Sequence, residues 1–200
     1  MMVLMNTTPQ GARVSLFGGS FNPPHLGHVW MTATALSMLD VDEVWWLPAA
    51  RHAFGKVFRF DIDERLHLCS LATAPFNGLA KVLPPPLPAE QVSYSYEELE
   101  ALQKARPDLN IRLLVGADVA ASLERFHRAP ELLERWGVDV VGRVGYELPE
   151  LPGADLHYCD VELPNVSSSE VRERLDRGES CLDLLPRAVW ERIRKQIRAR

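Results

Sequence analysis

Short apolar runs alternate along this chain with longer segments in which apolar residues recur at helical spacing. The short runs are rich in Val, Leu, Ile, Phe and Trp, and glycine or proline ends several of them, as is typical of strands. The expected strands cover residues 14–17, 44–48, 80–83, 111–116, 139–142 and 155–161. The last run alternates between apolar and polar positions, which indicates an edge strand. Strands that alternate with helices predict an α/β fold with a doubly wound parallel sheet.

Several of the helical segments have capping residues at their expected first turn. Asp and Ser side chains can accept a hydrogen bond from an otherwise unpaired backbone N–H group at a helix N-terminus. We expect helices that begin after His25, at Asp61 or Asp63, and at Ser93 or Ser95 with Glu98 as a capping-box partner. Further helices are expected from Ala117 through His127, after the serines at 167–169, and over residues 187–200.

The segment from Val14 to His28, V-S-L-F-G-G-S-F-N-P-P-H-L-G-H, is the most informative part of the sequence. Two consecutive glycines end the first strand, and Asn22-Pro23-Pro24 prevents an early helix because proline disfavours the αR conformation in the residue before it. The segment is therefore a strand, a glycine turn and a helix N-terminus, whose N–H groups and dipole suit a phosphate. His25 and His28 are three residues apart, so both can point at that phosphate.

Other kinds of site fit this segment less well. It lacks the G-x-x-x-x-G-K-[ST] pattern of a Walker A loop and the G-x-G-x-x-G pattern of dinucleotide binding. Ser20 has no glycine two places later, as a nucleophile elbow requires. A zinc site on His25 and His28 would need a third ligand, and no ligand stands at helical spacing beside them. A tight turn with two surface histidines is the plain structural alternative.

Composition and charge exclude several classes of protein. The chain has 200 residues, of which 46% are hydrophobic and 24% charged, values typical of one soluble globular domain. A net charge of −5 argues against a general nucleic-acid binder. Cys69, Cys159 and Cys181 form no C-x-x-C pair, which predicts reduced thiols in a cytoplasmic protein. No segment is long enough to span a bilayer, and residues 1–12 are expected to be a loose tail rather than a signal peptide.

Three further segments place polar residues after expected strands. Residues 49–60 form a basic segment containing Lys56 at the carboxyl edge of the sheet, where open α/β folds bind ligands; a solvated loop is the alternative. Gly116 and Asp118 also follow a strand, so Asp118 is either a ligand anchor or a plain N-cap. Three serines at 167–169 open a helix, and Arg172 lies one turn inside it, which predicts a second anion site.

Two of these segments resemble the signature motifs of a known superfamily. Residues 18–28, G-G-S-F-N-P-P-H-L-G-H, resemble the G-G-[ST]-F-[DN]-P-x-H-x-G-H motif of nucleotidyltransferases, in the form found in nicotinate mononucleotide adenylyltransferases. Residues 166–172, V-S-S-S-E-V-R, resemble the I-S-S-T-x-[IV]-R motif of the same family. The resemblance covers nearly the whole chain from Arg13 onward and implies one Rossmann-like domain over residues 13–200.

The resemblance implies transfer of an adenylyl group from ATP, with Mg²⁺, to nicotinate mononucleotide, which gives deamido-NAD and pyrophosphate. It implies that the catalytic residues are His25, His28 and Lys56. The residues implied to bind ATP and its phosphates are Gly18, Gly19, Ser20, Phe21, Gly116, Asp118, Ser168, Ser169 and Arg172. The residues implied to bind the mononucleotide are Asn22, Ser93, Tyr94, Ser95, Phe126 and Arg143. No dedicated metal site is evident, so substrate and water would hold the cation.

The chain departs from the family pattern at two places, and the acceptor is left open. Lys56 lies in R-H-A-F-G-K where the family has P-P-H-K, and Phe126 replaces a tryptophan. Nicotinamide mononucleotide, phosphopantetheine and a phospho-alcohol with CTP are the alternative acceptors. The alternatives that involve no nucleotidyl transfer are a nucleotide-binding regulator and a metal-dependent hydrolase. We expect the partners to be small-molecule substrates and expect no binding to nucleic acid or to a membrane. The sequence leaves the oligomeric state open, and a homodimer is one of the options.

Overall fold

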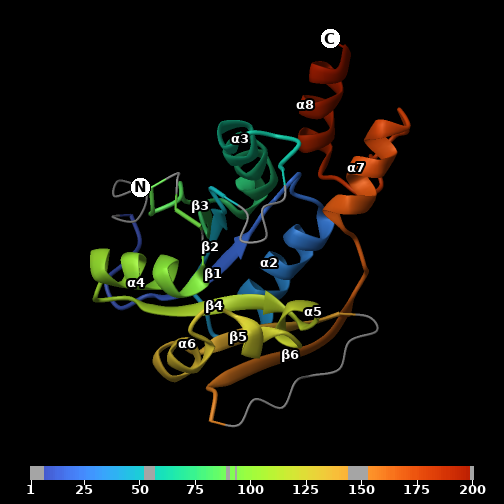
Figure 1. The fold of residues 1–200 in the computed structure, drawn as a ribbon. Helices are drawn as coiled ribbons and strands as arrows, with labels where there is room; N and C mark the ends of the chain where they lie inside the picture. Colours follow the sequence, from blue (N-terminus) through green and yellow to red (C-terminus); the bar gives the residue numbers. More distant parts are fainter. Residues whose placement is uncertain (1–6, 52–56, 89–90, 93, 144–152, 199–200) are drawn as a thin grey trace.

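A six-stranded parallel sheet forms the centre of the molecule (Figure 1). The computed structural model describes residues 7–51, 57–88, 91–92, 94–143 and 153–198. The strands are β1 (Arg13–Gly19), β2 (Glu43–Pro48), β3 (Ala80–Val82), β4 (Asn110–Gly116), β5 (Val138–Arg143) and β6 (Leu156–Leu163). Their order in the sheet is β3-β2-β1-β4-β5-β6, so the direction of winding reverses between β1 and β4. Open α/β sheets bind their ligands at such a switch point, beyond the carboxyl ends of the strands.

Helices cover both faces of the sheet. One face packs against α2 (Leu26–Met38), α3 (Ile62–Thr73), α7 (Ser168–Asp176) and α8 (Arg187–Arg198). The other packs against α4 (Ser95–Ala105), α5 (Ala117–Ala120) and α6 (Ala129–Arg135). Two 3₁₀ turns cover Ala74–Phe76 and Leu123–Arg125. Because both faces are covered, the central strands are apolar on both sides, and all six residues of β2 are buried. No helix of the described ranges has the length and apolar character needed to cross a membrane.

The sequence predicted the architecture and each strand correctly. The sheet is parallel and doubly wound, and β6 lies at its edge as the alternation of residues 155–161 indicated. Of the two candidate caps for α3, Asp61 is the residue used, since its carboxylate accepts a hydrogen bond from the Glu64 N–H group at 2.8 Å. The Ser95 cap is wrong, because Ser95 is already the first helical residue of α4 and Tyr94 stands at the N-cap. Ser93 lies outside the described residues.

The helix predicted from 117 through 127 is wrong beyond Ala120, where α5 ends. The backbone at Phe126 is extended, with φ −67° and ψ 150°. A separate helix, α6, begins at Ala129 and was not predicted. Pro130 lies in the first turn of α6, where its missing N–H group has no helical partner to lose. A helix can therefore begin at this proline but cannot run through it.

The expectation of a loose tail over residues 1–12 does not hold for its second half. Thr8 is 3% exposed, donates to Oε2 of Glu43 at 2.7 Å and accepts from Nζ of Lys81 at 2.7 Å. Ala12 belongs to the apolar core against the α4 face. Thr8 and Ala12 are therefore packed against the sheet, whereas residues 9–11 between them are exposed. The partners of Thr8 belong to β2 and β3, so no local pattern in the sequence could reveal this contact.

Candidate active site

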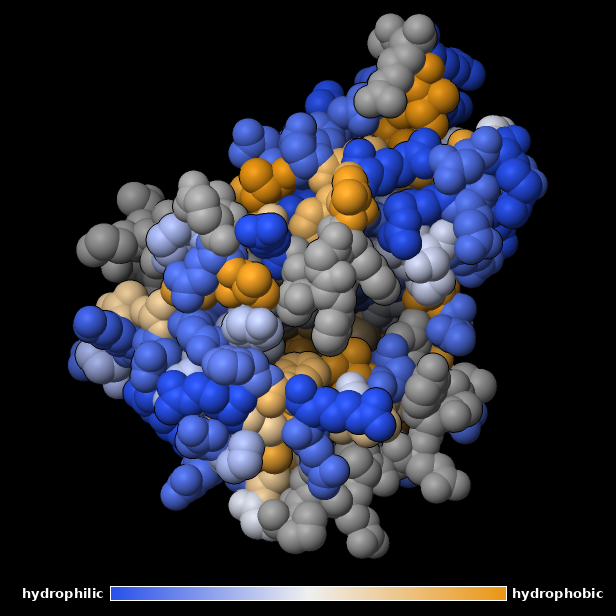
Figure 2. All heavy atoms as spheres, viewed as in Figure 1, coloured by the Kyte–Doolittle hydropathy of each residue, from blue (hydrophilic) through white to orange (hydrophobic). Residues whose placement is uncertain are grey.

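A pocket of about 370 Å³ lies at the carboxyl ends of the strands, over the switch point between β1 and β4. Its floor consists of the ends of β1, β4, β5 and β6, and its walls are the first turns of α2 and α7 with residues 57–58. Figure 2 shows a hollow near the centre of this face, with hydrophobic residues at its base and hydrophilic residues around it. The pocket is lined by predicted site residues Gly18, Gly19, Ser20, Asn22, His25, His28, Gly116, Asp118, Ser168, Ser169 and Arg172.

The turn between β1 and α2 is held in an unusual backbone conformation. Phe21 has φ +43°, a left-handed conformation that costs a non-glycine residue of the order of 1 kcal/mol. Its buried ring offsets that cost by stacking on Trp46, with centroids 4.8 Å apart and planes 12° apart. The ring of Phe21 therefore packs in the core, and Phe21 is not among the lining residues of the pocket.

Asn22, predicted to bind the mononucleotide, also has a structural role. Its side-chain Oδ1 accepts hydrogen bonds from the backbone N–H groups of Arg59 and Phe60 at 3.1 and 3.2 Å. The side chain is thereby fixed between the glycine turn and the segment that forms one wall of the pocket. Asn22 still lines the pocket, but its oxygen is occupied by these two donors.

The rings of the two histidines lie against each other at the start of α2, with their planes tilted by 31°. Their ring centroids are 3.7 Å apart, and the backbone N–H of His25 donates to Nδ1 of His28 at 3.0 Å. Since Nδ1 of His28 is an acceptor, the proton of its neutral ring is on Nε2, which makes Nε2 a hydrogen-bond donor. The rings of Phe21 and Phe17 lie 4.7 and 5.6 Å from the His28 ring and keep it in place.

The absence of a side chain at Gly27 leaves space for the His25 ring. A Cβ atom at Gly27 would lie 3.0 Å from Nδ1 and 3.1 Å from Cε1 of His25, closer than most real Cβ contacts. Gly116 has a similar relationship with Asp118, whose Oδ1 would lie 2.5 Å from a Cβ atom at Gly116. Both glycines thus leave room for the polar side chain that each motif brings into the pocket.

The second motif, at the start of α7, is bonded directly to the first. Ser167 is the N-cap and accepts from the Glu170 N–H group, while the Ser168 hydroxyl donates to the carbonyl of Pro23 at 2.9 Å. Arg172 donates to the carbonyl of Asn22 at 2.9 Å and to the Ser169 hydroxyl at 3.0 Å. Each serine of this triplet therefore has a distinct partner, and the two helix N-termini that were expected to bind anions open into one pocket.

The residues predicted to bind the mononucleotide are less completely assembled. Tyr94 stacks on His127 with ring centroids 4.6 Å apart, and the partly buried Phe126 packs against the core of the α4 face. Neither these side chains nor Ser95 is among the lining residues of the pocket. Lys56 and Ser93 lie outside the described residues, and of Arg143 only the backbone, at the end of β5, is described.

Sequence reasoning missed the apolar walls of the pocket and one buried arginine behind it. Met31, Val57, Phe58, Val119 and Leu163 line the pocket. Arg65 lies on α3, is 1% exposed and donates to the Ser20 carbonyl. Its position in an apparently ordinary amphipathic segment offers no local sign of burial, because its acceptors belong to other segments.

Asp118, His25 and His28 are the side chains of metal-ligating type that line the pocket. Among the described residues no group of three or more His, Cys, Asp and Glu side chains could hold a metal ion. A metal that enters with a polyphosphate fits this donor set better than a resident metal, because the phosphate oxygens and water would supply most of its ligands.

The sequence of the chain matches a known family of proteins. The model of the cytidylyltransferase-like family matches residues 16–174, which include every lining residue of the pocket. The chain belongs to this family. A probable nicotinate-nucleotide adenylyltransferase of Anaeromyxobacter dehalogenans is 37% identical and aligns over 93% of this chain and 96% of its own length. A protein of the same name from Rhodopirellula baltica is 32% identical over 94% of each chain.

Solved structures of this family have the same fold. The nicotinic acid mononucleotide adenylyltransferase of Plasmodium falciparum complexed with NaAD aligns with a TM-score of 0.79 over 92% of this chain and 96% of its own, at 14% identity. The same protein complexed with APC gives a TM-score of 0.77. The Rossmann-like architecture predicted from the sequence is confirmed by these comparisons.

Proposed function

We propose that this chain transfers the adenylyl group of ATP to nicotinate mononucleotide. A phosphate oxygen of the mononucleotide attacks the α-phosphorus, the bond from that phosphorus to the bridging oxygen of the β-phosphate breaks, and pyrophosphate leaves with the bonding electrons. Deamido-NAD is the other product. The observation that carries the proposal is that two helix N-termini meet at one switch-point pocket, where the rings of His25 and His28 lie against each other. The names of the relatives support the same reaction.

In this proposal the histidines stabilise charge that develops on the phosphates. Nε2 of His28 donates a hydrogen bond to an oxygen of the transferred group, and His25 assists from the same turn. Gly18, Gly19, Ser20 and Phe21 would contact the triphosphate through their backbone, as glycine turns at helix N-termini do. No covalent intermediate is required, so catalysis consists of positioning and electrostatic stabilisation.

The second helix N-terminus would hold the leaving pyrophosphate. Ser168, Ser169 and Arg172 lie at the rim of the pocket, and a guanidinium group suits a phosphate because it offers several donors in one plane. Lys56 would add a further positive charge to the phosphates. Gly116 and Asp118 would approach the nucleoside from the end of β4.

The acceptor would lie on the side of the glycine turn nearer α4. We assign it to Ser93, Tyr94, Ser95 and Phe126, with Asn22 and Arg143 at the strand ends. ATP would bring a divalent cation, which we take to be Mg²⁺ and which would neutralise charge on the phosphates. We also take the enzyme to be cytoplasmic and leave its oligomeric state to measurement.

The proposal is tested by measuring pyrophosphate release from ATP and Mg²⁺ with nicotinate mononucleotide and, separately, with nicotinamide mononucleotide. Turnover with the acid form, with deamido-NAD identified by mass, is the expected result. Turnover with nicotinamide mononucleotide alone would identify that compound, instead of the acid form, as the acceptor. If neither mononucleotide gives pyrophosphate release while ATP still binds, the acceptor is not a pyridine mononucleotide. Another phosphorylated acceptor or a nucleotide-binding regulator would then be favoured.

A further inference from the structure

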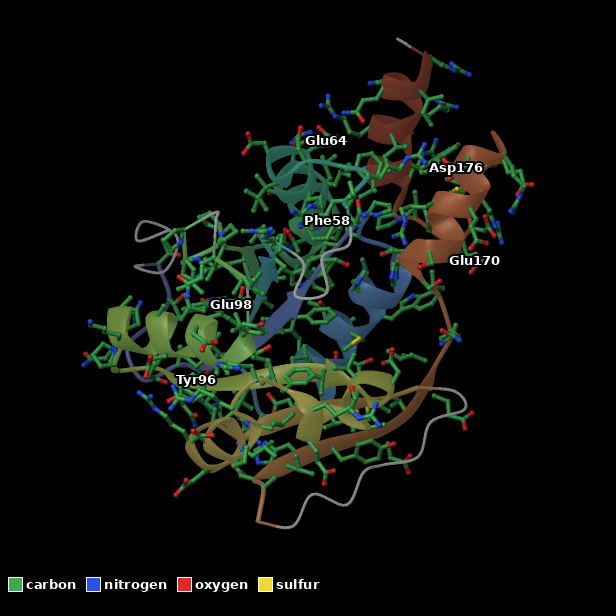
Figure 3. The ribbon with its side chains drawn as sticks, viewed as in Figure 1. Phe58, Glu64, Tyr96, Glu98, Glu170 and Asp176 are labelled. Atoms are coloured by element: carbon green, nitrogen blue, oxygen red, sulfur yellow. The ribbon has the colours of Figure 1, made fainter. Side chains whose placement is uncertain are left out.

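Arg65 is a fully buried arginine that bridges two segments of the pocket. It lies in the first turn of α3 and is 1% exposed. Its Nη1 donates to the Ser20 carbonyl at 2.9 Å, and its Nε donates to the Phe60 carbonyl at 3.2 Å. Its guanidinium carbon lies 4.0 Å from the centroid of the Phe58 ring, which lines the pocket. Figure 3 shows Phe58 between α3 and α7, on the side where the two motifs meet.

The charge of Arg65 is not balanced in the way usual for a buried arginine. Within the ranges that the structure describes, no carboxylate forms an ion pair with it, and its hydrogen-bond acceptors are main-chain carbonyls. Burial lowers the pKa of its guanidinium, although an arginine side chain remains protonated in proteins. Asp61 stabilises the charge through a coulombic interaction, but the direct hydrogen bonds of the guanidinium are to main-chain carbonyls, so the orientation of Arg65 is set by the backbone of the segments around it.

The bond to Ser20 fixes the direction of one peptide group in the glycine turn. The peptide between Ser20 and Phe21 is trans, so its C=O and N–H point to opposite sides. With the carbonyl turned toward Arg65, the N–H group of Phe21 is turned away from α3. Two other carbonyls of this turn are also bonded from outside it, that of Asn22 by Arg172 and that of Pro23 by Ser168.

We infer that Arg65 is a positioning residue that sets the conformation of the glycine turn, and so orients the turn's backbone toward the phosphates of bound ATP. It does so by holding the Ser20 carbonyl, and it fixes the Phe58 wall through the stacked guanidinium and the Phe60 carbonyl. The left-handed conformation of Phe21 requires such support, because the surrounding structure must maintain a strained backbone. This inference rests on the proposed function insofar as ATP is the ligand of the pocket.

The test is the dissociation constant for ATP with Mg²⁺, measured by calorimetry on the full chain. Arg65→Met removes both hydrogen bonds at similar length and should weaken ATP binding about 10- to 100-fold, the range for hydrogen bonds to charged groups. Arg65→Lys keeps the charge but lacks the planar fork, so it should recover part of the loss. The matched control is Arg192→Met, because Arg192 pairs with Glu64, the neighbour of Arg65 on α3, and should stay within about twofold of wild type.

A merely structural role would give a different pattern. It would lower the folded fraction and kcat together and leave the affinity of the folded molecules unchanged, whereas the inference requires a higher KM for ATP with little change in KM for the mononucleotide. Wild-type affinity in folded Arg65→Met, or in Arg65→Lys if the Met variant does not fold, would overturn the inference. Binding needs no turnover, so a wild type that binds ATP but transfers nothing would refute the proposed function alone.

Discussion

Arg172 donates a hydrogen bond of 2.9 Å to the main-chain oxygen of Asn22, a residue 150 positions earlier in the chain. This bond joins the helix that begins with three serines to the turn that contains two glycines and two histidines. With the bond from Ser168 to the Pro23 carbonyl, it makes one pocket of two motifs that are separate in the sequence. The geometry of each motif therefore depends on the other.

Arg172→Lys is the variant that tests this dependence. A lysine keeps the positive charge but cannot bond the Asn22 carbonyl and the Ser169 hydroxyl in the same planar arrangement. We expect KM for ATP to rise about 10-fold, the lower end of the range for hydrogen bonds to charged groups, in steady-state assays of pyrophosphate release.

Arg174→Lys is the control for this variant. Arg174 lies on the same helix, but its partners are Glu170 and Asp183, away from the pocket. Equal effects of the two substitutions on KM would show that α7 is disturbed as a whole and would contradict a specific role for the Arg172–Asn22 bond.

Gly27→Ala separates stability from activity. Alanine favours a helix over glycine by up to about 1 kcal/mol, but Gly27 is buried and the new Cβ atom would crowd the His25 ring, so the two effects oppose each other and the free energy of unfolding should change little. Its Cβ atom would lie 3.0 Å from Nδ1 of His25, so the ring must shift. We expect kcat to fall at least about 10-fold, since small displacements of catalytic groups cost this much or more. Urea unfolding and turnover of the same preparation check both parts, and unchanged kcat would show that the His25 ring position is unimportant.

The sequence predicted those parts of the fold that local chemistry determines. The strand, glycine turn and helix of residues 14–28 were correct because glycine and proline act on their immediate neighbours. The helix through residue 127 was wrong because the chain leaves the α-helix after Ala120 and forms a separate 3₁₀ turn over Leu123–Arg125, a break that no glycine or proline within residues 117–127 signals. Thr8 and Arg65 were missed because their burial depends on contacts with segments far along the chain. The second anion site was predicted, whereas its bonds to Asn22 and Pro23 could come only from the three-dimensional structure.

The three cysteines should be unreactive in the folded protein. All three are buried, and burial raises the pKa of Cys69, Cys159 and Cys181, so little thiolate is present at neutral pH. Iodoacetamide should therefore label none of them under native conditions and all three in urea, as counted by mass spectrometry. Rapid native labelling accompanied by loss of activity would contradict this arrangement.

Asp139 should be important for stability and not for the chemistry. It is fully buried near the start of β5, accepts from Nε of Arg112 at 2.7 Å and from the Ser15 hydroxyl, and lies away from the pocket. Asp139→Asn would leave the buried guanidinium of Arg112 with only the exposed carboxylate of Asp155 and should lower the free energy of unfolding by about 3 kcal/mol. The rate per folded molecule should be retained.

The control for Asp139→Asn is Glu179→Gln, which removes an exposed carboxylate paired with Arg177. It should leave the urea midpoint unchanged, because exposed ion pairs contribute little. A similar loss in both variants would mean that the burial of the Asp139–Arg112 pair is not what stabilises the fold.

The turnover of His28→Ala tests the central claim, that adenylyl transfer takes place at the first turn of α2. Loss of one donor to the developing charge costs about 2.7–4 kcal/mol, so kcat should fall about 10²- to 10³-fold. His67→Ala, at an exposed histidine of α3, should keep the wild-type rate. A folded His28→Ala variant that turns over ATP and nicotinate mononucleotide within about threefold of wild type would contradict the account.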